Sequence, residues 1–508
     1  MNLVIWLESL FRHVDYSVYY YSLLVLFTLD LVFFLPMAST FFDDQGPRNN
    51  RLQARVICLF LIWALSLTLA ASSENAPRLL GLIGLFFLFR FFFISRRWKT
   101  VRRGFGAPGF MSHWAIRFLL FFEIARCFDP SQRLLRTLIE VYQIDFAVIM
   151  ICAGTYKALS GYLNNDGMEY GRVNPSWGYH WRFFGKKSPH GFYPYLMNCV
   201  AAIVELVAGV FMLIPNSTTR LLGAIAISLS FYYVANFIRL GRLAILMVVL
   251  PLLYWPTVHN NLLEVRAVSW APLPFEMPLE LPSTVVSGLV LLCWMYVGIL
   301  PLVKFNQYYN MLSGRVLPRW LHVPLTAFAN FVPIIIWRVF TADLVNFYVR
   351  IVVEGKRIPN GELALVDENL YSARGCRRFL FKLRYLHVTE SIALTSLFTT
   401  LKYFKSNRKM FDDKMCVYSN VFLRTIDPLI EKDVERIRYE YISIQKAKES
   451  FLYQHVGNFY FDRATQLIRE EKVDSDFDFS ARTEHSPIRE TTGRGSYEAK
   501  PSPAEAVH

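Results

Sequence analysis

The chain has 508 residues, of which 54% are hydrophobic and 16% aromatic, and its mean hydropathy is positive. This composition excludes an ordinary soluble protein of this size. The formal net charge is +14, but many basic residues lie in short loops beside apolar segments, as at 96–103. That placement favours membrane lipids, rather than nucleic acid, as the partner of the basic residues.

Most of the first 340 residues fall into apolar segments of the length that a membrane-spanning helix needs. Residues 1–16 come first and predict an amphipathic helix in the membrane interface. Nine segments of about 17 to 25 residues suited to crossing the hydrocarbon core follow, at 17–39, 54–72, 78–95, 110–128, 139–160, 193–215, 220–238, 243–258 and 282–304. Residues 17–340 therefore predict an all-α polytopic membrane bundle of about 8–10 transmembrane helices.

Two apolar or proline-rich stretches in this part are interpreted differently. Residues 257–281 are rich in proline and acidic residues, which predicts an extended excursion outside the membrane. The stretch 323–340 contains Pro333 and favours an interfacial or re-entrant helix over a tenth span.

The composition changes after residue 340, and residues 341–471 predict a small extramembrane α+β module. Alternating residues at 345–355 predict a strand, 359–361 a turn and 362–367 a returning strand. The stretch 376–465 is charged and is predicted to be helical, with a solvated helix whose apolar stripe is Leu429, Val434, Ile437 and Tyr441. Cys376 and Cys416 are either two free thiols or a disulfide. Residues 472–508 contain few apolar residues and predict a disordered tail.

Several ionisable residues interrupt the apolar segments and should face the interior of the bundle or an interface. They are Asp30, Arg90, Arg117, Glu123, Arg126 and Glu205. Glu123 and Arg126 are three residues apart on one helix, which predicts a structural ion pair. Glu205 has no basic neighbour along its own segment, so it needs a distant partner or a proton, and Lys157 and Arg239 are the candidates.

A second group of polar residues follows the apolar segment 139–160. It comprises Lys157, Asp166, Glu169, Arg172 and His180, in a long loop rich in Gly, Asn and Tyr. Such a loop can supply polar groups and aromatic walls for a site, or serve only as a lid. His180 and Trp181 can equally be membrane-interface anchors. No Cys or Cys/His spacing typical of a metal site is present, so no metal is predicted.

The order of these features resembles the horizontally transferred transmembrane family, which includes vitamin K-dependent γ-carboxylase. The resemblance rests on AGTYK ending at Lys157, then GMEY, then His180-Trp181, then VELVAG with Glu205. It implies that Lys157 is the base that deprotonates a reduced quinone and that His180 takes the place of the family's loop histidine. The chain departs from the family pattern in ALSGYLNN after Lys157 and in a longer insertion before His180.

The same passage is also similar to the lipase maturation factors of the endoplasmic reticulum. Those proteins have a lysine, a later histidine-tyrosine, a segment with VEL and a strand that ends in IEG, and this chain has VEGK at a comparable place. The two resemblances imply different functions for a similar membrane core.

Three functions remain open. The first is a membrane enzyme, carboxylase-like or a carbon–carbon lyase, that uses Lys157 as general base. Its implied substrates are a reduced, vitamin K-like quinone and a peptide client. Lys157, His180 and Glu205 are the candidate catalytic residues, and Tyr170, Arg172, Trp181 and Arg239 the candidate substrate-binding residues.

The second function is a non-catalytic maturation factor that binds a client protein, and the third is a transporter in which Glu205 and Lys157 relay protons. All three place the chain in a membrane, either the bacterial inner membrane or the endoplasmic reticulum. The basic cluster at 96–103 and the family resemblance favour opposite membrane orientations for the Lys157–His180 loop.

Overall fold

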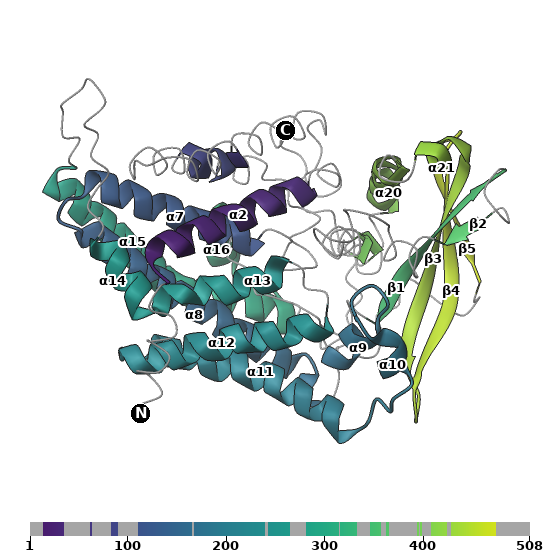
Figure 1. Ribbon diagram of the computed structural model, residues 1–508, viewed down its shortest axis with the longest axis horizontal. Coiled ribbons are helices and arrows are strands. Elements are labelled where there is room, and N and C mark those ends of the chain that lie inside the picture. The colour runs from purple at the N-terminus through teal and green to yellow at the C-terminus, as the bar shows by residue number, and fades with distance from the viewer. Residues whose placement is uncertain are drawn as a thin grey trace.

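The computed structural model describes residues 14–34, 61–62, 83–89, 110–164, 167–238, 242–264, 281–313, 315–332, 346–356, 362–364, 394–395, 397–398, 408–423 and 428–473. Two parts can be distinguished within them, a bundle of helices and an antiparallel sheet that stands beside one end of the bundle (Figure 1). The bundle contains α2 (Tyr16–Phe34), α7 (Phe110–Phe128), α8 (Arg133–Leu159), α11 (Phe192–Leu213), α12 (Ser217–Phe237), α13 (Arg242–Val249), α14 (Pro256–Glu264), α15 (Ser283–Ser313) and α16 (Arg319–Phe331).

Four helical segments of the described chain are long and apolar enough to cross a membrane. They are α8 together with the following turn, α11, α12 and α15, and they correspond to the predicted segments 139–160, 193–215, 220–238 and 282–304. The segment 243–258 forms a broken pair instead, because the helix of residues 243–254 meets α14 at a bend of 67°. Counting that pair as one span gives five.

The predicted segment 110–128 is α7 over its whole length. The other predicted segments are described only in part, and 17–39 is helical as far as Phe34. Of 54–72 and 78–95, only residues 61–62 and 83–89 are described, and these are helical. Helix α16 covers the first half of 323–340. The predicted interfacial helix lies outside the described residues up to residue 13, as does the predicted tail beyond residue 473.

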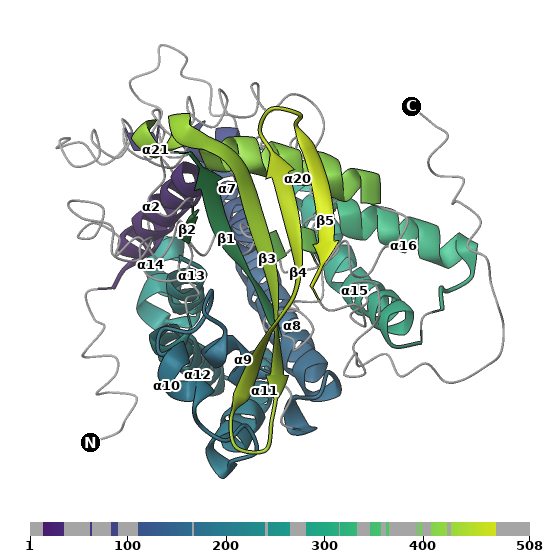
Figure 2. The same cartoon turned by 90° about the vertical axis from the view of Figure 1, so that its right-hand side faces the viewer.

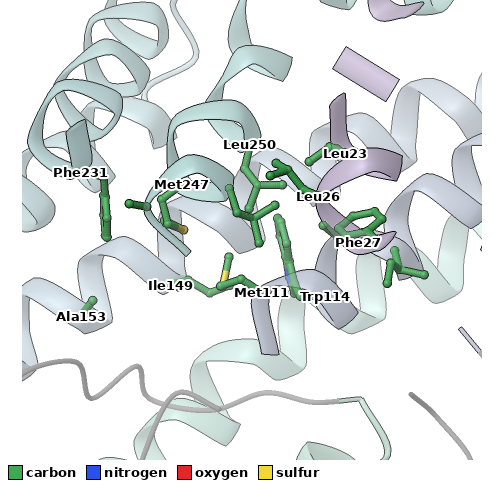
Figure 3. Close-up of a cluster of buried hydrophobic side chains, with 14 of the residues drawn as sticks. Leu23, Leu26, Phe27, Met111, Trp114, Ile149, Ala153, Phe231, Met247 and Leu250 are labelled. Atoms are coloured by element: carbon green, nitrogen blue, oxygen red, sulfur yellow. The ribbon is translucent and has the colours of Figure 1, made fainter. Parts of the chain in front are cut away.

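Helix α8 is the central helix of the bundle. In its apolar window 78% of the residues are buried, against 39% in α11, 28% in α12 and 11% in α15. Side chains from α2, α7, α8, α12 and α13 meet in one core, which includes Phe27, Trp114, Ile149 and Met247 (Figure 3). The outer helices expose apolar side chains such as Leu229 and Leu291, which is the pattern of a surface that contacts lipid rather than water.

The sheet has five antiparallel strands in the order β2-β1-β3-β4-β5. These are β1 (Phe347–Gly355), β2 (Glu362–Ala364), β3 (Val434–Lys446), β4 (Phe451–Asp462) and β5 (Leu467–Lys472). The predicted strand at 345–355 and its return at 362–367 are confirmed over their described residues as the β1–β2 pair, in which Val353 pairs with Leu363. Figure 2 shows the long β3–β4 hairpin, whose lower end reaches α9 (Met168–Val173) and α10 (Trp181–Gly185).

The two faces of the sheet carry different chemistry. Helix α20 (Arg408–Leu423) packs on the apolar face, where Phe411 contacts Phe459 and Ser419 shares a hydrogen bond of 2.8 Å with the Tyr439 hydroxyl. The opposite face carries a cross-strand network in which Arg438 binds Glu354 at 2.6 Å and Glu440 at 3.0 Å. An antiparallel sheet that is covered on one face needs apolar side chains on that face and polar ones on the other, so apolar and polar residues alternate along its strands.

The predicted helical stretch 376–465 is helical in α20 and in α21 (Pro428–Asp433) but is wrong from Val434 on, where the chain forms β3 and β4. Helix α21 is only six residues long, and β3 begins at Val434. The residues Val434, Ile437 and Tyr441 match a helical period, but Ile437, Tyr439 and Tyr441 also alternate with Arg438 and Glu440. Aromatic and β-branched residues in alternation favour a strand, and pairing with β1 and β4 decides the outcome.

Two further expectations are settled in part. The predicted extended excursion at 257–281 is wrong for its first residues, because Pro256–Glu264 is helical, and 265–280 lie outside the described residues. Cys416 is a free thiol that donates a hydrogen bond to the Gln466 carbonyl at 3.1 Å. Cys376 lies outside the described residues.

Lys414 of α20 gives the sheet a pH-dependent stability. Its side chain is buried, and burial lowers the pKa of Lys414 to about 8, whereas an unfolded lysine titrates near 10.4. Between these values the unfolded chain binds more protons, so stability rises with pH from about 8 to about 10.4. We expect Lys414→Met to raise the melting temperature at pH 7 by about 2–4 °C, and the difference from wild type to shrink at pH 10.

Thermal scans of wild type and variant at the two pH values measure this effect. Lys409→Met, which removes an exposed lysine from the same helix, is the matched control and should change little. A gain in Lys414→Met that is equal at both pH values would show that charge burial is not its cause.

Candidate functional site

The predicted ion pair between Lys157 and Glu205 is present. Lys157 lies in the last turn of α8, Glu205 lies near the middle of α11, and the lysine Nζ binds the carboxylate Oε1. Both residues are buried, with exposed fractions of 6% for Lys157 and 3% for Glu205. The lysine therefore does not extend its amine to water at the end of its helix, which is the usual alternative for a lysine in such a place.

Glycines bring the two helices close enough for this contact. A Cβ atom on Gly154 would lie 2.6 Å from the Leu206 backbone nitrogen, and one on Gly209 would lie 2.9 Å from the Ile151 nitrogen. Such close approach of backbones through small residues is typical of helix pairs in membranes. AGTYK and VELVAG are thus the two sides of one helix contact, and the ion pair sits at its edge.

One carboxylate oxygen of the pair remains available. Glu205 Oε2 is buried and has no hydrogen-bond partner among the described residues. The ring of Tyr162, fully buried in the short helix η1 (Tyr162–Asn164), lies 5.9 Å from Lys157 Nζ. A buried oxygen without a donor is unfavourable, so a ligand hydroxyl or a water that donates to Oε2 would be stabilised there.

A second buried polar cluster was not predicted from the sequence. Asp145 of α8 accepts hydrogen bonds from Trp114 Nε1 at 2.8 Å, Tyr296 at 2.6 Å and Arg117 at 3.3 Å. These contacts join α8 to α7 and α15. An aspartate inside the apolar run VYQIDFAVIM was the available signal in the sequence.

The predicted Glu123–Arg126 pair is confirmed at 3.0 Å, and Glu123 also accepts a hydrogen bond from Tyr16 of α2 at 2.8 Å.

The GMEY segment joins the bundle to the sheet. Glu169 is buried, binds Lys446 of β3 at 2.7 Å and accepts a hydrogen bond from Asn198 of α11 at 2.6 Å. The Tyr170 ring packs edge-on against Phe451 of β4, with ring centroids 5.9 Å apart. These contacts give Glu169 and Tyr170 a structural role where α9 meets the sheet (Figure 1).

The segment around His180 makes a similar connection. Trp181 packs edge-on against Tyr453 of β4 at 5.8 Å, and the Tyr453 hydroxyl donates to the Val173 carbonyl at 2.7 Å. His180 precedes α10, and its side chain is exposed and makes no contact with Lys157 or Glu205 among the described residues. The structure thus brings together two of the three candidate catalytic residues.

The structure describes one of the three remaining candidates. Arg172 of α9 is buried beneath aromatic rings, and Asp166 and Arg239 lie outside the described residues. Within the described ranges, no group of three or more His, Cys, Asp or Glu side chains could hold a metal ion. In comparisons with family models, curated proteins and solved structures, the chain matches none.

Proposed function

We propose that the chain is an integral membrane enzyme that removes a proton from a lipophilic hydroxyl substrate of the reduced-quinone class at the Lys157–Glu205 pair. The observation that carries the proposal is the buried pair, whose oxygen Oε2 has no hydrogen-bond partner in the described part of the chain. The two helices that carry the pair, α8 and α11, are long and apolar enough to cross a membrane, so the substrate would arrive from the bilayer. A quinol hydroxyl fits this site because it donates the hydrogen bond that Oε2 lacks.

The chemistry requires one proton transfer. The substrate O–H bond breaks, and its proton forms a new O–H bond at Glu205 Oε2. The pair then holds a carboxylic acid at Glu205 and an ammonium at Lys157, and this ammonium stabilises the substrate oxyanion. The family resemblance assigns the base to Lys157, and the carboxylate at its side makes the pair the unit that accepts the proton. The quinolate is the form that dioxygen oxidises most readily.

The test is oxidation of a reduced isoprenoid naphthoquinone by the full-length protein in lipid nanodiscs under air. We expect Lys157→Ala and Glu205→Gln each to lower the rate per folded protein by about 10²-fold or more, the usual range for loss of a general base. Glu123→Gln, which alters another buried ion pair, is the control and should retain the rate. Full activity in both Lys157→Ala and Lys157→Arg would exclude the proposed role of the lysine.

A second candidate function is a maturation factor that holds a client protein at the membrane. It is favoured by the loop contacts, since Tyr170 and Trp181 are used to hold the sheet against the bundle. This function predicts that Lys446→Ala, which removes the bond to Glu169, impairs client maturation, while Lys157 variants that fold do not. Co-expression with secreted client enzymes, measured by their activity, distinguishes the two functions.

A further inference from the structure

Arg172 is a buried cation for which the described residues supply few hydrogen-bond acceptors. Its exposed fraction is 5%, and its Nε and Nη2 atoms have no hydrogen-bond partner among the described residues. Glu169 attracts the guanidinium, but it accepts its hydrogen bonds from Gly167, Asn198 and Lys446. Burial lowers the pKa of Arg172 from its ordinary value. Buried arginines are normally paired, since a buried N–H group without an acceptor is destabilising.

Aromatic rings surround this guanidinium. The Cζ atom lies 3.7 Å from the ring centroid of Phe184, 4.9 Å from that of Tyr193 and 5.5 Å from that of Phe237. Aromatic faces attract a cation, but they accept no ordinary N–H hydrogen bond. The cage therefore stabilises the charge and leaves its hydrogen-bonding capacity for an anion with oxygen acceptors.

The cage lies where two apolar helices end. Tyr193 is in the first turn of α11, and Phe237 is the last residue of α12. The Tyr193 and Tyr233 hydroxyls lie 2.9 Å apart, and both tyrosines are exposed. Aromatic residues at the ends of apolar helices mark the membrane interface, where lipid headgroups lie.

Apolar and basic surfaces continue from the cage. On α11 the exposed side chains that follow Tyr193 include Leu196, Val200 and Ile203, which could line the path of an acyl chain. A basic residue lies beside the cage as well: Lys187 Nζ is 5.1 Å from the centroid of the Phe183 ring, and that ring contacts Phe184 of the cage. A ligand with an anionic head and an apolar tail matches both surfaces.

We infer that Arg172 and its aromatic cage form a binding site for the phosphate headgroup of an anionic phospholipid. The guanidinium donates charge-assisted hydrogen bonds to the phosphate oxygens, and the acyl chains lie along the exposed face of α11. This inference does not rest on the proposed catalytic role of Lys157, because the site shares no residue with the ion pair.

The test measures binding of phosphatidylglycerol and phosphatidylcholine to the full-length protein in detergent, by native mass spectrometry and by the lipid-dependent rise in melting temperature. Arg172→Met removes the charge and keeps an apolar side chain of similar length. Arg182→Met makes the same change at an exposed arginine of α10 and is the matched control. Tyr193→Ala removes one wall of the cage and keeps the charge.

We expect wild type to prefer phosphatidylglycerol, and Arg172→Met to weaken its binding by about tenfold or more, the loss expected for one strong charge-assisted interaction. Arg182→Met should change it by less than about twofold, and Tyr193→Ala should have an intermediate effect. Without lipid, Arg172→Met should melt at or above the wild-type temperature, because it removes an unpaired buried charge.

Three results would overturn the inference. Unchanged phosphatidylglycerol binding in Arg172→Met would exclude the site. A marked loss of lipid-free stability in that variant would show that the guanidinium has a structural partner within the protein. Inorganic phosphate that stabilises wild type as strongly as phosphatidylglycerol, at equal concentration, would assign the site to a soluble anion rather than to a lipid.

Discussion

Lys157→Ala is expected to destabilise the folded protein by about 3–5 kcal/mol, because it leaves the Glu205 carboxylate buried without its counter-charge. The double variant Lys157→Met with Glu205→Leu is expected to recover most of this loss, since well-packed apolar side chains often replace a buried ion pair at little or no cost in stability. Unfolding of the purified protein in mixed micelles, followed as a function of denaturing detergent, gives the free energies for both variants.

The exposed pair Lys356–Glu435 in the sheet is the control for this experiment. Its removal by Lys356→Ala tests a lysine–glutamate pair outside the bundle, and exposed pairs contribute less than about 1 kcal/mol. If Lys157→Ala were as stable as wild type, the buried pair would not be part of the folded structure. If the double variant were as unstable as the single one, steric packing rather than unpaired charge would explain the loss.

Gly154→Ala is expected to separate α8 from α11. Its added Cβ would lie 2.6 Å from the Leu206 nitrogen and 2.7 Å from the Ala202 carbonyl oxygen, and backbone atoms cannot move aside as a flexible side chain can. We expect a loss of at least about 1–3 kcal/mol, the usual range for overpacking a filled contact. Unfolding of the purified protein in mixed micelles, as for Lys157→Ala, measures this loss.

Gly298→Ala provides the matched control. Gly298 is also a helical glycine in an apolar helix, α15, but its added Cβ would meet no atom within 4 Å. Alanine is favoured over glycine in a helix by about 1 kcal/mol, so this variant should be as stable as wild type or more stable. Equal effects of the two substitutions would mean that the close approach at Gly154 does not hold the helices together.

Sequence periodicity predicted the helical part of the fold well where segments were long and apolar. The segments that became α8, α11, α12 and α15 were predicted because hydrocarbon length and helix rise set a recognisable run of residues. Strand β3 was missed because Val434, Ile437 and Tyr441 fit a helical and an alternating pattern at once, and only partner strands distinguish the two.

The candidate site could likewise be predicted only in part from the sequence. The Lys157–Glu205 pair could be predicted because a charge in an apolar segment needs a partner, and few partners exist. The roles of Glu169 and Trp181 could not, since their contacts on β3 and β4 come from residues more than 250 positions away in the chain. His180 was grouped with Lys157 by its position in the loop, but the loop carries its side chain to an exposed place.

The central claim is that the Lys157–Glu205 pair accepts a proton from a lipophilic hydroxyl substrate. Infrared difference spectroscopy of the protein in nanodiscs, recorded under argon on addition of a reduced isoprenoid naphthoquinone, tests this directly because a protonated carboxyl group has its own C=O stretch. We predict that this band appears with quinol, is absent in Glu205→Gln and persists in Glu123→Gln. A spectrum without the band in wild-type protein that has bound the quinol would contradict the claim.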